Sequence, residues 1–184
     1  MRLTRLAIPD VALIDLVRHG DARGFFEESW RASRFRALGL DVEFVQDNLA
    51  RSSRGVLRGL HYQLPPAAQG KLVRVTRGRV FDVAVDLRTG SSTFGRWVGA
   101  ELSEDVPRLL WVPPGFAHGY LVLSESADFT YKVTAEYAPE LERGLVWNDP
   151  TVDIDWPWDG EPELSSRDRA LPDLASAAHV PATP

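Results

Sequence analysis

The stretch LVRVTRGRVFDVAVDLR, residues 72–88, shows which class of fold the sequence encodes. Before Gly78, valines alternate with polar residues, and this period of two is typical of a β-strand. After Gly78, Asp82 and Asp86 lie on one face of a second run. The opposite face of that run carries Phe81, Val83, Val85 and Leu87. The stretch therefore predicts two β-strands separated by a turn at Gly78.

Short runs of the same kind follow at spacings of roughly ten residues, as in all-β sandwiches. They are FGRWVGAEL (94–102), RLLWVPPGF (108–116), GYLVLS (119–124) and DFTYKVTAEY (128–137). The 14 glycines and 13 prolines are scattered between such runs as turn residues and do not form a linker. Helical patterns are confined to residues 29–39 and 165–178. The sequence thus predicts an all-β antiparallel sandwich or barrel with short flanking helices.

Length and composition limit the possible classes of protein. A chain of 184 residues suits one domain, which we expect over residues 1–173, followed by a flexible tail from 174 to 184. Without cysteine it has no disulfide and no thiolate metal ligand. A net charge of -5 argues against non-specific binding to nucleic acid. No segment approaches the ~20 apolar residues of a membrane span, and Arg5 and Pro9 interrupt any signal peptide, so we expect a cytoplasmic protein.

The histidines narrow the search for functional residues. His19 lies in a loop and His179 in the predicted tail, whereas His61 and His118 lie in or beside apolar strands. The strand VLRGLHYQ, residues 56–63, also contains Arg58. Burying a charge in a strand costs several kcal/mol unless the charge is paired or has a function. Residues 56–63 are therefore the first candidate for a functional site.

A second motif lies in PPGFAH, residues 113–118, which matches the PxGxxH turn of cupin β-barrels. Metal-binding cupins complete this motif with an upstream HxH and a glutamate. Here the corresponding stretch is His61-Tyr62-Gln63, and the window for the glutamate reads PPAA, residues 65–68. Two imidazoles do not fill a typical site of three or four ligands. We therefore expect a cupin-type jelly-roll barrel that holds no metal.

Nine motifs follow one another between about Asp10 and Asp173, namely GDARGFFEE, FVQDN, GVLRGLHYQ, QGKLVRV, VFDVAVDLR, STFG, VPPGFAHGY, YKVTAEYAPELERGLVWNDP and LSSRD. This ordered series resembles the dTDP-4-dehydrorhamnose 3,5-epimerase family. The resemblance implies a cupin jelly-roll homodimer that works without metal or other cofactor. It also implies a substrate, dTDP-4-keto-6-deoxyglucose, whose carbons C3 and C5 beside the C4 ketone are inverted.

The resemblance assigns four catalytic residues. Inversion next to a ketone needs a base, a stabiliser for the enolate oxygen, and an acid on the opposite face of the ring. By resemblance His61 is the base and Asp168 its partner, Lys71 stabilises the enolate, and Tyr131 returns the proton. Each has a plainer alternative. His61 could be a hydrogen-bonded core histidine, Tyr131 strand packing, Lys71 a solvated charge, and Asp168 a helix cap.

The resemblance also implies contacts to the nucleotide and sugar. Arg23 and Arg58 fit the diphosphate, because arginine forks bind phosphate oxygens well. Glu28 resembles the residue that reads the thymine edge, and Tyr137 an aromatic residue that stacks on the base. The remaining predicted substrate-binding residues are Phe26, Gln46, Asp47, Asn48, His118, Glu142, Arg143 and Arg167. Arg167 departs from the lysine of many members, which puts its ligand contact in doubt, and a surface charge or salt bridge is the alternative for such peripheral residues.

Three other functions stay open at this stage. Relatives that invert C3 or C5 alone, on deoxysugars of antibiotic biosynthesis, share the base and the lysine. A cupin ketoisomerase would move the carbonyl between C3 and C4, although the Tyr131 and Lys71 pair favours epimerisation. A catalytically silent cupin that binds sugar or stores protein would be free to lose the base, the acid or the lysine, and none of the three is missing.

Overall fold

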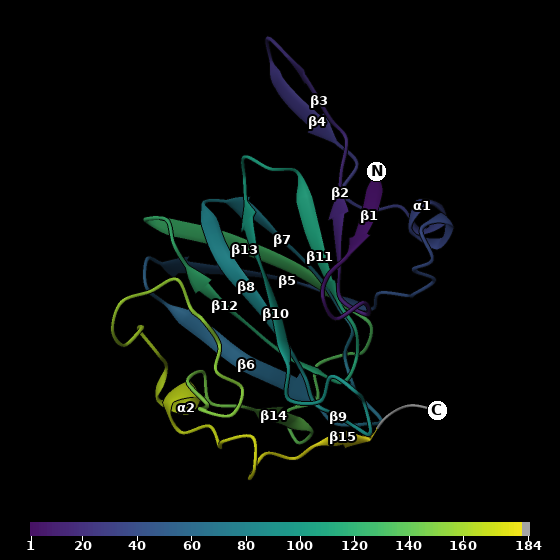
Figure 1. The fold of residues 1–184 in the computed structure, drawn as a ribbon. Coiled ribbons are helices and arrows are strands. Elements are labelled where there is room, and N and C mark those ends of the chain that lie inside the picture. Colours follow the sequence, from purple (N-terminus) through teal and green to yellow (C-terminus); the bar gives the residue numbers. More distant parts are fainter. Residues whose placement is uncertain (182–184) are drawn as a thin grey trace.

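The computed structural model describes residues 1–181, and its main body is two antiparallel β-sheets that face each other (Figure 1). One sheet has six strands in the order β1 (Arg2–Arg5), β2 (Ala12–Asp15), β11 (Arg108–Val112), β7 (Lys71–Arg77), β13 (Ser126–Val133) and β5 (Gln46–Ser53). The other has five strands in the order β10 (Trp97–Ser103), β8 (Arg79–Asp86), β12 (Phe116–Val122), β6 (Leu57–Gln63) and β14 (Glu142–Gly144). The predicted all-β fold is confirmed.

Helices contribute little to this architecture. The two within residues 1–181 are α1 (Ala32–Ala37) and α2 (Ser166–Arg169), which lie in the two segments where the sequence shows helical patterns. Neither helix of this described part is long and apolar enough to cross a bilayer. Two strand pairs complete the fold, namely β3 (Arg18–Asp21) with β4 (Gly24–Glu27), and β9 (Arg88–Thr89) with β15 (Val180–Pro181).

The turn at Gly78 carries the chain from one sheet to the other, because β7 and β8 lie in different sheets. Gly78 has a φ of 78°, in the left-handed region that favours glycine. A Cβ there would lie 2.0 Å from the carbonyl oxygen of Ser126, which leaves no room for any other residue. The sequence therefore predicted the two strands and the turn, and the structure adds that the strands belong to opposite walls of the barrel.

Both faces of β8 are buried. On the inner face, Val80 and Ala84 pack between the two sheets. On the outer face, Val83 and Val85 pack against residues of the C-terminal segment, among them Leu174. Each fully buried valine of this strand stabilises the fold by roughly 1.5–3 kcal/mol. Asp82 and Asp86 share the inner face, so the polar side of this strand lies in the barrel and not in solvent.

The C-terminal segment differs from the predicted flexible tail beginning at residue 174. Leu174, Ala177 and Val180 are buried against the outer face of the five-stranded sheet. β15 pairs with β9 in a parallel arrangement, and the hydroxyl of Tyr62 donates to the carbonyl of Ala178 at 2.5 Å. Apolar residues spaced along residues 174–180 supply this contact. The remaining part of the predicted tail, residues 182–184, lies outside the described residues.

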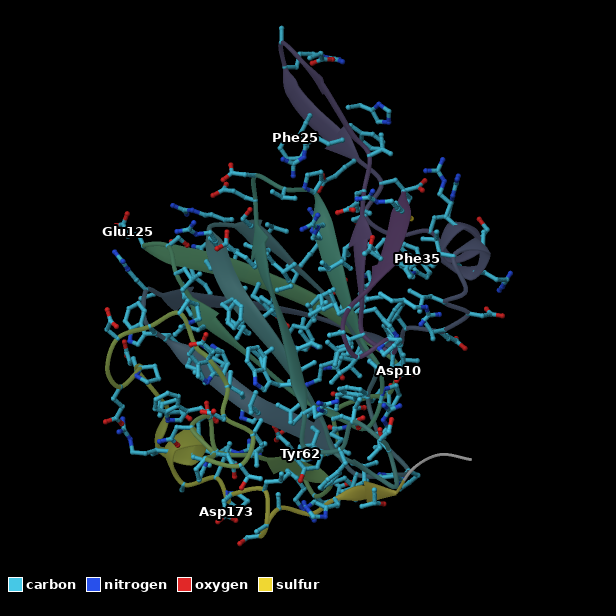
Figure 2. All side chains as sticks on the ribbon, in the orientation of Figure 1. Asp10, Phe25, Phe35, Tyr62, Glu125 and Asp173 are labelled. Carbon is cyan, nitrogen blue, oxygen red and sulfur yellow. The ribbon has the colours of Figure 1, made fainter. Side chains whose placement is uncertain are left out.

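The β3–β4 hairpin projects away from both sheets (Figure 1). Phe25 and Phe26 on it are exposed, and Figure 2 shows Phe25 on the projecting arm. By contrast, Phe35 of α1 is buried against the outer face of the six-stranded sheet (Figure 2). Exposed aromatic side chains on a projecting hairpin mark a surface suited to contact with another molecule.

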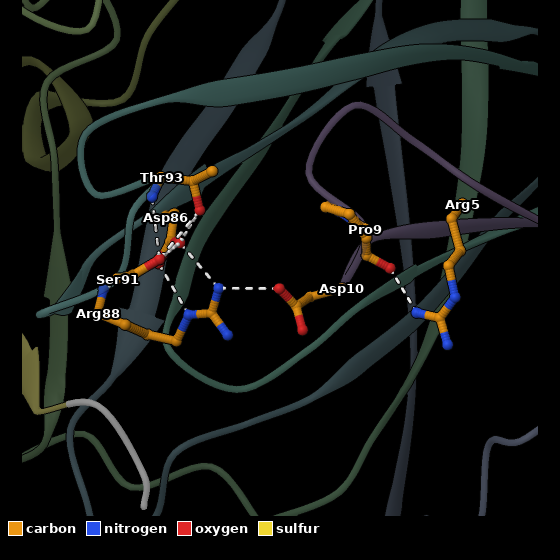
Figure 3. Close-up of polar contacts among 7 residues, drawn as sticks. All are labelled: Arg5, Pro9, Asp10, Asp86, Arg88, Ser91 and Thr93. Atoms are coloured by element: carbon orange, nitrogen blue, oxygen red, sulfur yellow. Dashed lines mark hydrogen bonds and ion pairs between the residues drawn. The ribbon is translucent and has the colours of Figure 1, made fainter.

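A buried carboxylate at one end of β8 ties two loops together (Figure 3). Asp86 accepts hydrogen bonds from Ser91, Thr93 and Arg88, and Arg88 also reaches Asp10. Burial alone would raise the pKa of Asp86, but these donors lower it, so the carboxylate stays ionised. None of these residues lines the cavity described next.

Candidate active site

A cavity of about 560 Å³ opens between the two sheets. One wall comes from β6 and β12 of the five-stranded sheet, and the opposite wall from β5, β7 and β13 of the six-stranded sheet. Residues 163–168, which lead into α2, line a further side. All four residues predicted to be catalytic line this cavity, together with Arg58, His118, Tyr137, Glu142 and Arg167.

A β-bulge in β6 brings Arg58 and His61 to the same cavity. In a regular strand, residues three apart point to opposite faces. The Cα partner of His61 is His118, and that of Arg58 is Tyr120, so three steps along β6 match two along β12. The extra residue reverses the alternation. Leu57, Leu60 and Tyr62 then face outward, while Arg58 and His61 line the cavity.

Gly59 makes this bulge possible. Its φ is 121°, and a Cβ there would lie 2.7 Å from the Cα of Gly119 on β12. A glycine inside a strand often marks a bulge or a close backbone approach. Gly59 of the motif RGLHYQ and Gly119 of the motif AHGY therefore allow β6 and β12 to approach closely. This close approach forms the bulge that brings Arg58 and His61 to the cavity.

His61 and Asp168 form a hydrogen-bonded pair, with Nε2 of the imidazole 2.7 Å from Oδ1 of the carboxylate. Ser165 caps α2 by accepting from the backbone N–H of Asp168, so the Asp168 side chain is free to face His61. Burial would raise the pKa of Asp168, but the bonds from His61 and neighbouring groups lower it. An ionised carboxylate only accepts hydrogen bonds, so Nε2 carries the donated proton and Nδ1 is left as the basic atom.

Lys71 is buried at the start of β7, and its Nζ donates to the backbone carbonyl of His61 at 3.0 Å. Burial lowers the pKa of Lys71 to about 8, although the charges of Asp82 and Glu142 oppose this shift. A buried lysine whose charge is held by nearby carboxylates can still be cationic at neutral pH. The arrangement places an ammonium group in the cavity, beside the backbone of His61.

A second histidine–aspartate pair lies deeper in the cavity. Nε2 of His118 is 2.9 Å from Oδ1 of Asp82 and 3.1 Å from Oδ2. Burial lowers the pKa of His118 and raises that of Asp82, while their mutual attraction opposes both shifts. Asp82 was not predicted as a site residue, because a carboxylate that alternates with apolar residues in VFDVAVDLR also fits a solvent-facing position.

Tyr131 comes from β13, on the wall opposite His61. Burial raises the pKa of its phenol, and the positive charge of Arg58 partly reverses this shift. Its ring lies beside Phe129, which is stacked on Tyr120 with ring centroids 4.0 Å apart. Tyr120 and Phe129 also line the cavity, and the sequence motifs gave no reason to select Tyr120.

Three residues meet at the mouth of the cavity. The Tyr137 hydroxyl donates to Oε2 of Glu142 at 2.5 Å, and Nη2 of Arg167 lies 2.6 Å from the same oxygen. Burial would raise the pKa of Glu142, but these two partners lower it. Gln46, which is outside the cavity wall, accepts from the backbone N–H of Tyr137 at 2.9 Å and so supports this group.

The structure places the other predicted binding residues elsewhere. Arg23 and Phe26 lie on the projecting arm, and Glu28 follows it, within 3.4 Å of Arg31 and 3.3 Å of Arg34. Asp47 and Asn48 line a separate hollow on the outer face of the six-stranded sheet. The guanidinium of Arg143 donates to the backbone carbonyls of residues 140 and 142. These residues do not reach the cavity of their own chain.

The donor atoms of the cavity do not form a typical metal site. Within residues 1–181, no group of three or more His, Cys, Asp or Glu side chains is arranged to hold a metal ion. His61 and His118 each face a carboxylate with Nε2.

Comparison with known proteins identifies the family. Residues 5–176 match the sequence model of the dTDP-4-dehydrorhamnose 3,5-epimerases. The chain belongs to this family. A dTDP-4-dehydrorhamnose 3,5-epimerase from Pseudomonas aeruginosa is 58% identical over 98% of this chain and 100% of that protein. The predicted resemblance is therefore confirmed, and the chain is an isomerase of the epimerase class.

Solved structures of dTDP-sugar epimerases have the same fold. The enzyme from Legionella pneumophila, in complex with dTDP-4-keto-L-rhamnose, has a TM-score of 0.95 and 46% identity, covering 100% of this chain and 99% of that chain. NovW, a 4-keto-6-deoxy sugar epimerase from the novobiocin gene cluster of Streptomyces spheroides, has a TM-score of 0.90 and 40% identity, covering 95% and 88%. The cupin-type jelly roll expected from the motifs is thus the fold of this epimerase family member.

Proposed function

We propose that this epimerase inverts C3 and C5 of dTDP-4-keto-6-deoxyglucose without a cofactor, giving dTDP-4-dehydrorhamnose. The observation that carries the proposal is the placement of His61 and Tyr131 on opposite walls of one cavity, with Lys71 beside His61. A sugar ring between these walls would present one face to the imidazole and the other to the phenol. Removal of a proton from one face and return from the other is inversion.

The first half of the reaction is proton abstraction. Nδ1 of His61 takes the proton from the carbon next to the ketone, and the C–H electron pair forms a carbon–carbon double bond. The C4 oxygen becomes an enolate oxygen, which the Lys71 ammonium stabilises. Asp168, hydrogen-bonded to Nε2 at 2.7 Å, holds the imidazole orientation and stabilises the imidazolium that forms.

The second half is reprotonation from the opposite wall. The Tyr131 O–H gives its proton to the carbon, the enolate returns to the ketone, and the phenolate that remains regains a proton from solvent. Arg58 favours this step because its positive charge lowers the pKa that burial has raised. The imidazolium of His61 releases its proton, and the same cycle then acts at the second carbon.

The nucleotide part of the substrate is assigned to the cavity mouth and to Arg58. We propose that the guanidinium of Arg58 binds the diphosphate and that Tyr137 stacks on the thymine ring. His118, Gln46, Glu142 and Arg167 support the sugar and the nucleotide from the positions described above.

We further propose a homodimer, in which the projecting arm of one copy contacts its partner. The arm exposes Phe25 and Phe26, and it carries Arg23 away from the cavity of its own chain. In a dimer of this kind Arg23, Phe26 and Glu28 would contact substrate in the partner's cavity. Light scattering at micromolar concentration is expected to give twice the monomer mass, and a monomer would contradict the proposal.

A cytoplasmic location is also part of the proposal, in keeping with a chain that has no cysteine. Cell fractionation should recover the protein with cytoplasmic enzymes. Recovery with the periplasmic or membrane fraction would contradict this location.

A relative that inverts only one carbon is the second candidate, because the fold is also that of ChmJ, a 3'-monoepimerase from Streptomyces bikiniensis with a TM-score of 0.87 and 38% identity. Incubation with dTDP-4-keto-6-deoxyglucose in heavy water separates the possibilities. NMR is expected to show deuterium and inverted configuration at both C3 and C5, with turnover unchanged by a chelator. Deuterium at one carbon alone would indicate a mono-epimerase. A product with its carbonyl at C3 would indicate a ketoisomerase, and a complete lack of exchange would indicate a sugar-binding protein.

A further inference from the structure

Ser52 is a buried polar residue beside the cavity, and the proposed reaction gives it no role. It lies on β5, at the edge of the six-stranded sheet, on the same strand face as Ala50, which lines the cavity. Its Oγ accepts a hydrogen bond of 2.8 Å from Nε of Arg58, which belongs to the five-stranded sheet. The bond therefore joins the two walls at the point where Arg58 enters the cavity.

Arg58 is exposed at the cavity, and it differs in its partners from several other arginines of this protein. Other guanidiniums are neutralised by carboxylates, as in the pairs Arg51–Asp128, Arg74–Glu27 and Arg88–Asp86. Within residues 1–181, no carboxylate forms an ion pair with Arg58, and its Nε bond to Ser52 is its one side-chain hydrogen bond. A guanidinium has five N–H donors, so the four of the Nη groups are left for a ligand.

The groups around Arg58 are held in place. Ser52 is buried, so its hydroxyl has little freedom to move away from Arg58. Tyr120 is the Cα partner of Arg58 on β12, and its ring is stacked on Phe129 with ring centroids 4.0 Å apart. Arg58 is therefore hydrogen-bonded to a fixed group and paired with a strand position whose side chain is also fixed.

We infer that Ser52 is a positioning residue, whose hydroxyl fixes the Arg58 guanidinium so that its Nη groups face the diphosphate of the substrate. This inference rests on the proposed function, because that proposal assigns the diphosphate to Arg58. The physical reason is preorganisation: a long side chain that is already held in its binding geometry loses less conformational freedom when the ligand arrives.

The test compares Ser52→Thr with Ser52→Val, which have the same shape and differ in the hydroxyl. Binding of dTDP, which lacks the sugar, is measured by calorimetry and reports the nucleotide contacts alone. Ser52→Thr should bind dTDP as the wild type does, because threonine is well accommodated in a strand. Ser52→Val should bind about threefold to tenfold more weakly, the range expected for one hydrogen bond.

The same two substitutions in an Arg58→Ala background distinguish positioning from a general packing defect. If Ser52 acts through Arg58, Ser52→Val should have no further effect on dTDP binding once Arg58 is removed. Equal weakening in both backgrounds, or wild-type binding by Ser52→Val, would overturn the inference. If Arg58→Ala itself leaves dTDP binding unchanged, the assignment of the diphosphate to Arg58 fails instead. Melting temperatures check folding, and Ser52→Ala replaces the valine variant if that one does not fold.

Discussion

The cavity contains two histidine–aspartate pairs that are alike in bonding and unlike in exposure. Nε2 of the imidazole lies 2.7 Å from the carboxylate in His61–Asp168 and 2.9 Å in His118–Asp82, and the two histidines are Cα partners on adjacent strands. The side chains of the outer pair are 28% and 6% exposed, whereas those of the inner pair are 7% and 0% exposed. The same kind of hydrogen bond therefore occurs at an accessible position in the outer pair and in the protein interior in the inner pair.

This difference in exposure is the reason why we assign His61 to catalysis and the inner pair to support. Nδ1 of His61 can meet a ligand, and Asp168 stays ionised to receive the positive charge that a base acquires. Burial lowers the pKa of His118 and so disfavours its charged form, which makes the inner pair a poor place to store a proton. Asp82 instead contributes negative charge beside Lys71. A histidine–aspartate pair is thus no evidence of a base until its access to substrate is known.

The largest expected effect contrasts His61→Ala with His118→Ala. His61→Ala should lower both epimerisation and exchange of sugar protons by about 10²–10⁴-fold, the usual contribution of a general base, with stability close to the wild type. His118→Ala leaves Asp82 buried without its imidazole and should lower the free energy of unfolding by about 3–5 kcal/mol. Exchange kinetics and urea unfolding measure the two effects. If folded His118→Ala loses exchange as completely as His61→Ala, the contrast between the pairs is wrong.

A smaller effect is expected at Lys71. Lys71→Ala should slow exchange and inversion by about 10²–10³-fold, as for loss of one oxyanion donor. In the wild type, turnover should fall as the pH rises through about 8, where Lys71 loses its proton.

The stability of the protein should change with pH in the opposite direction. The pKa of Lys71 in the folded protein, about 8, lies below its ordinary value of 10.5. Between these two values the unfolded chain holds the proton that the folded protein has released, so the contribution of Lys71 to stability increases with pH. Urea unfolding from pH 8 to 10 should show this slope, and Lys71→Met should reduce it. An unchanged slope in Lys71→Met would contradict a depressed pKa.

The smallest effect is expected at Arg167, where the family often has lysine. Its guanidinium is half-exposed and pairs with Glu142 at 2.6 Å at the cavity mouth. Exposed ion pairs contribute about 0–1 kcal/mol, so Arg167→Lys should change KM by no more than about fivefold and leave kcat unaltered. A tenfold loss in kcat would show that Arg167 takes part in the reaction itself, and not only in binding at the cavity mouth.

The residues of the outer pair could be predicted from the sequence, but the backbone geometry that brings them together could not. Period-two patterns gave the strands, and the motifs selected His61, Lys71, Tyr131 and Asp168. Regular alternation would have put Arg58 and His61 on opposite faces, and the bulge that prevents this depends on Gly59 meeting Gly119 of another strand. Such a contact between distant segments leaves only a weak local signal.

Asp82 of the inner pair was missed for a related reason. Asp82 alternates with apolar residues, as a solvent-facing residue of a half-buried strand does. It is buried because residues of the C-terminal segment cover the outer face of β8 and turn the polar face into the barrel. The same covering explains why residues that follow residue 173 pack against the five-stranded sheet and do not form a free tail.

The placement of base and acid on opposite walls is tested most directly by Tyr131→Phe in heavy water, with dTDP-4-keto-6-deoxyglucose as substrate. His61 can still remove the proton in this variant and can return a deuteron from the side it left. NMR should therefore show deuterium at C3 with retained configuration, and inversion at C3 and C5 should be largely lost. Inversion of both carbons at the wild-type rate would contradict the assignment of Tyr131 as the acid on the far wall.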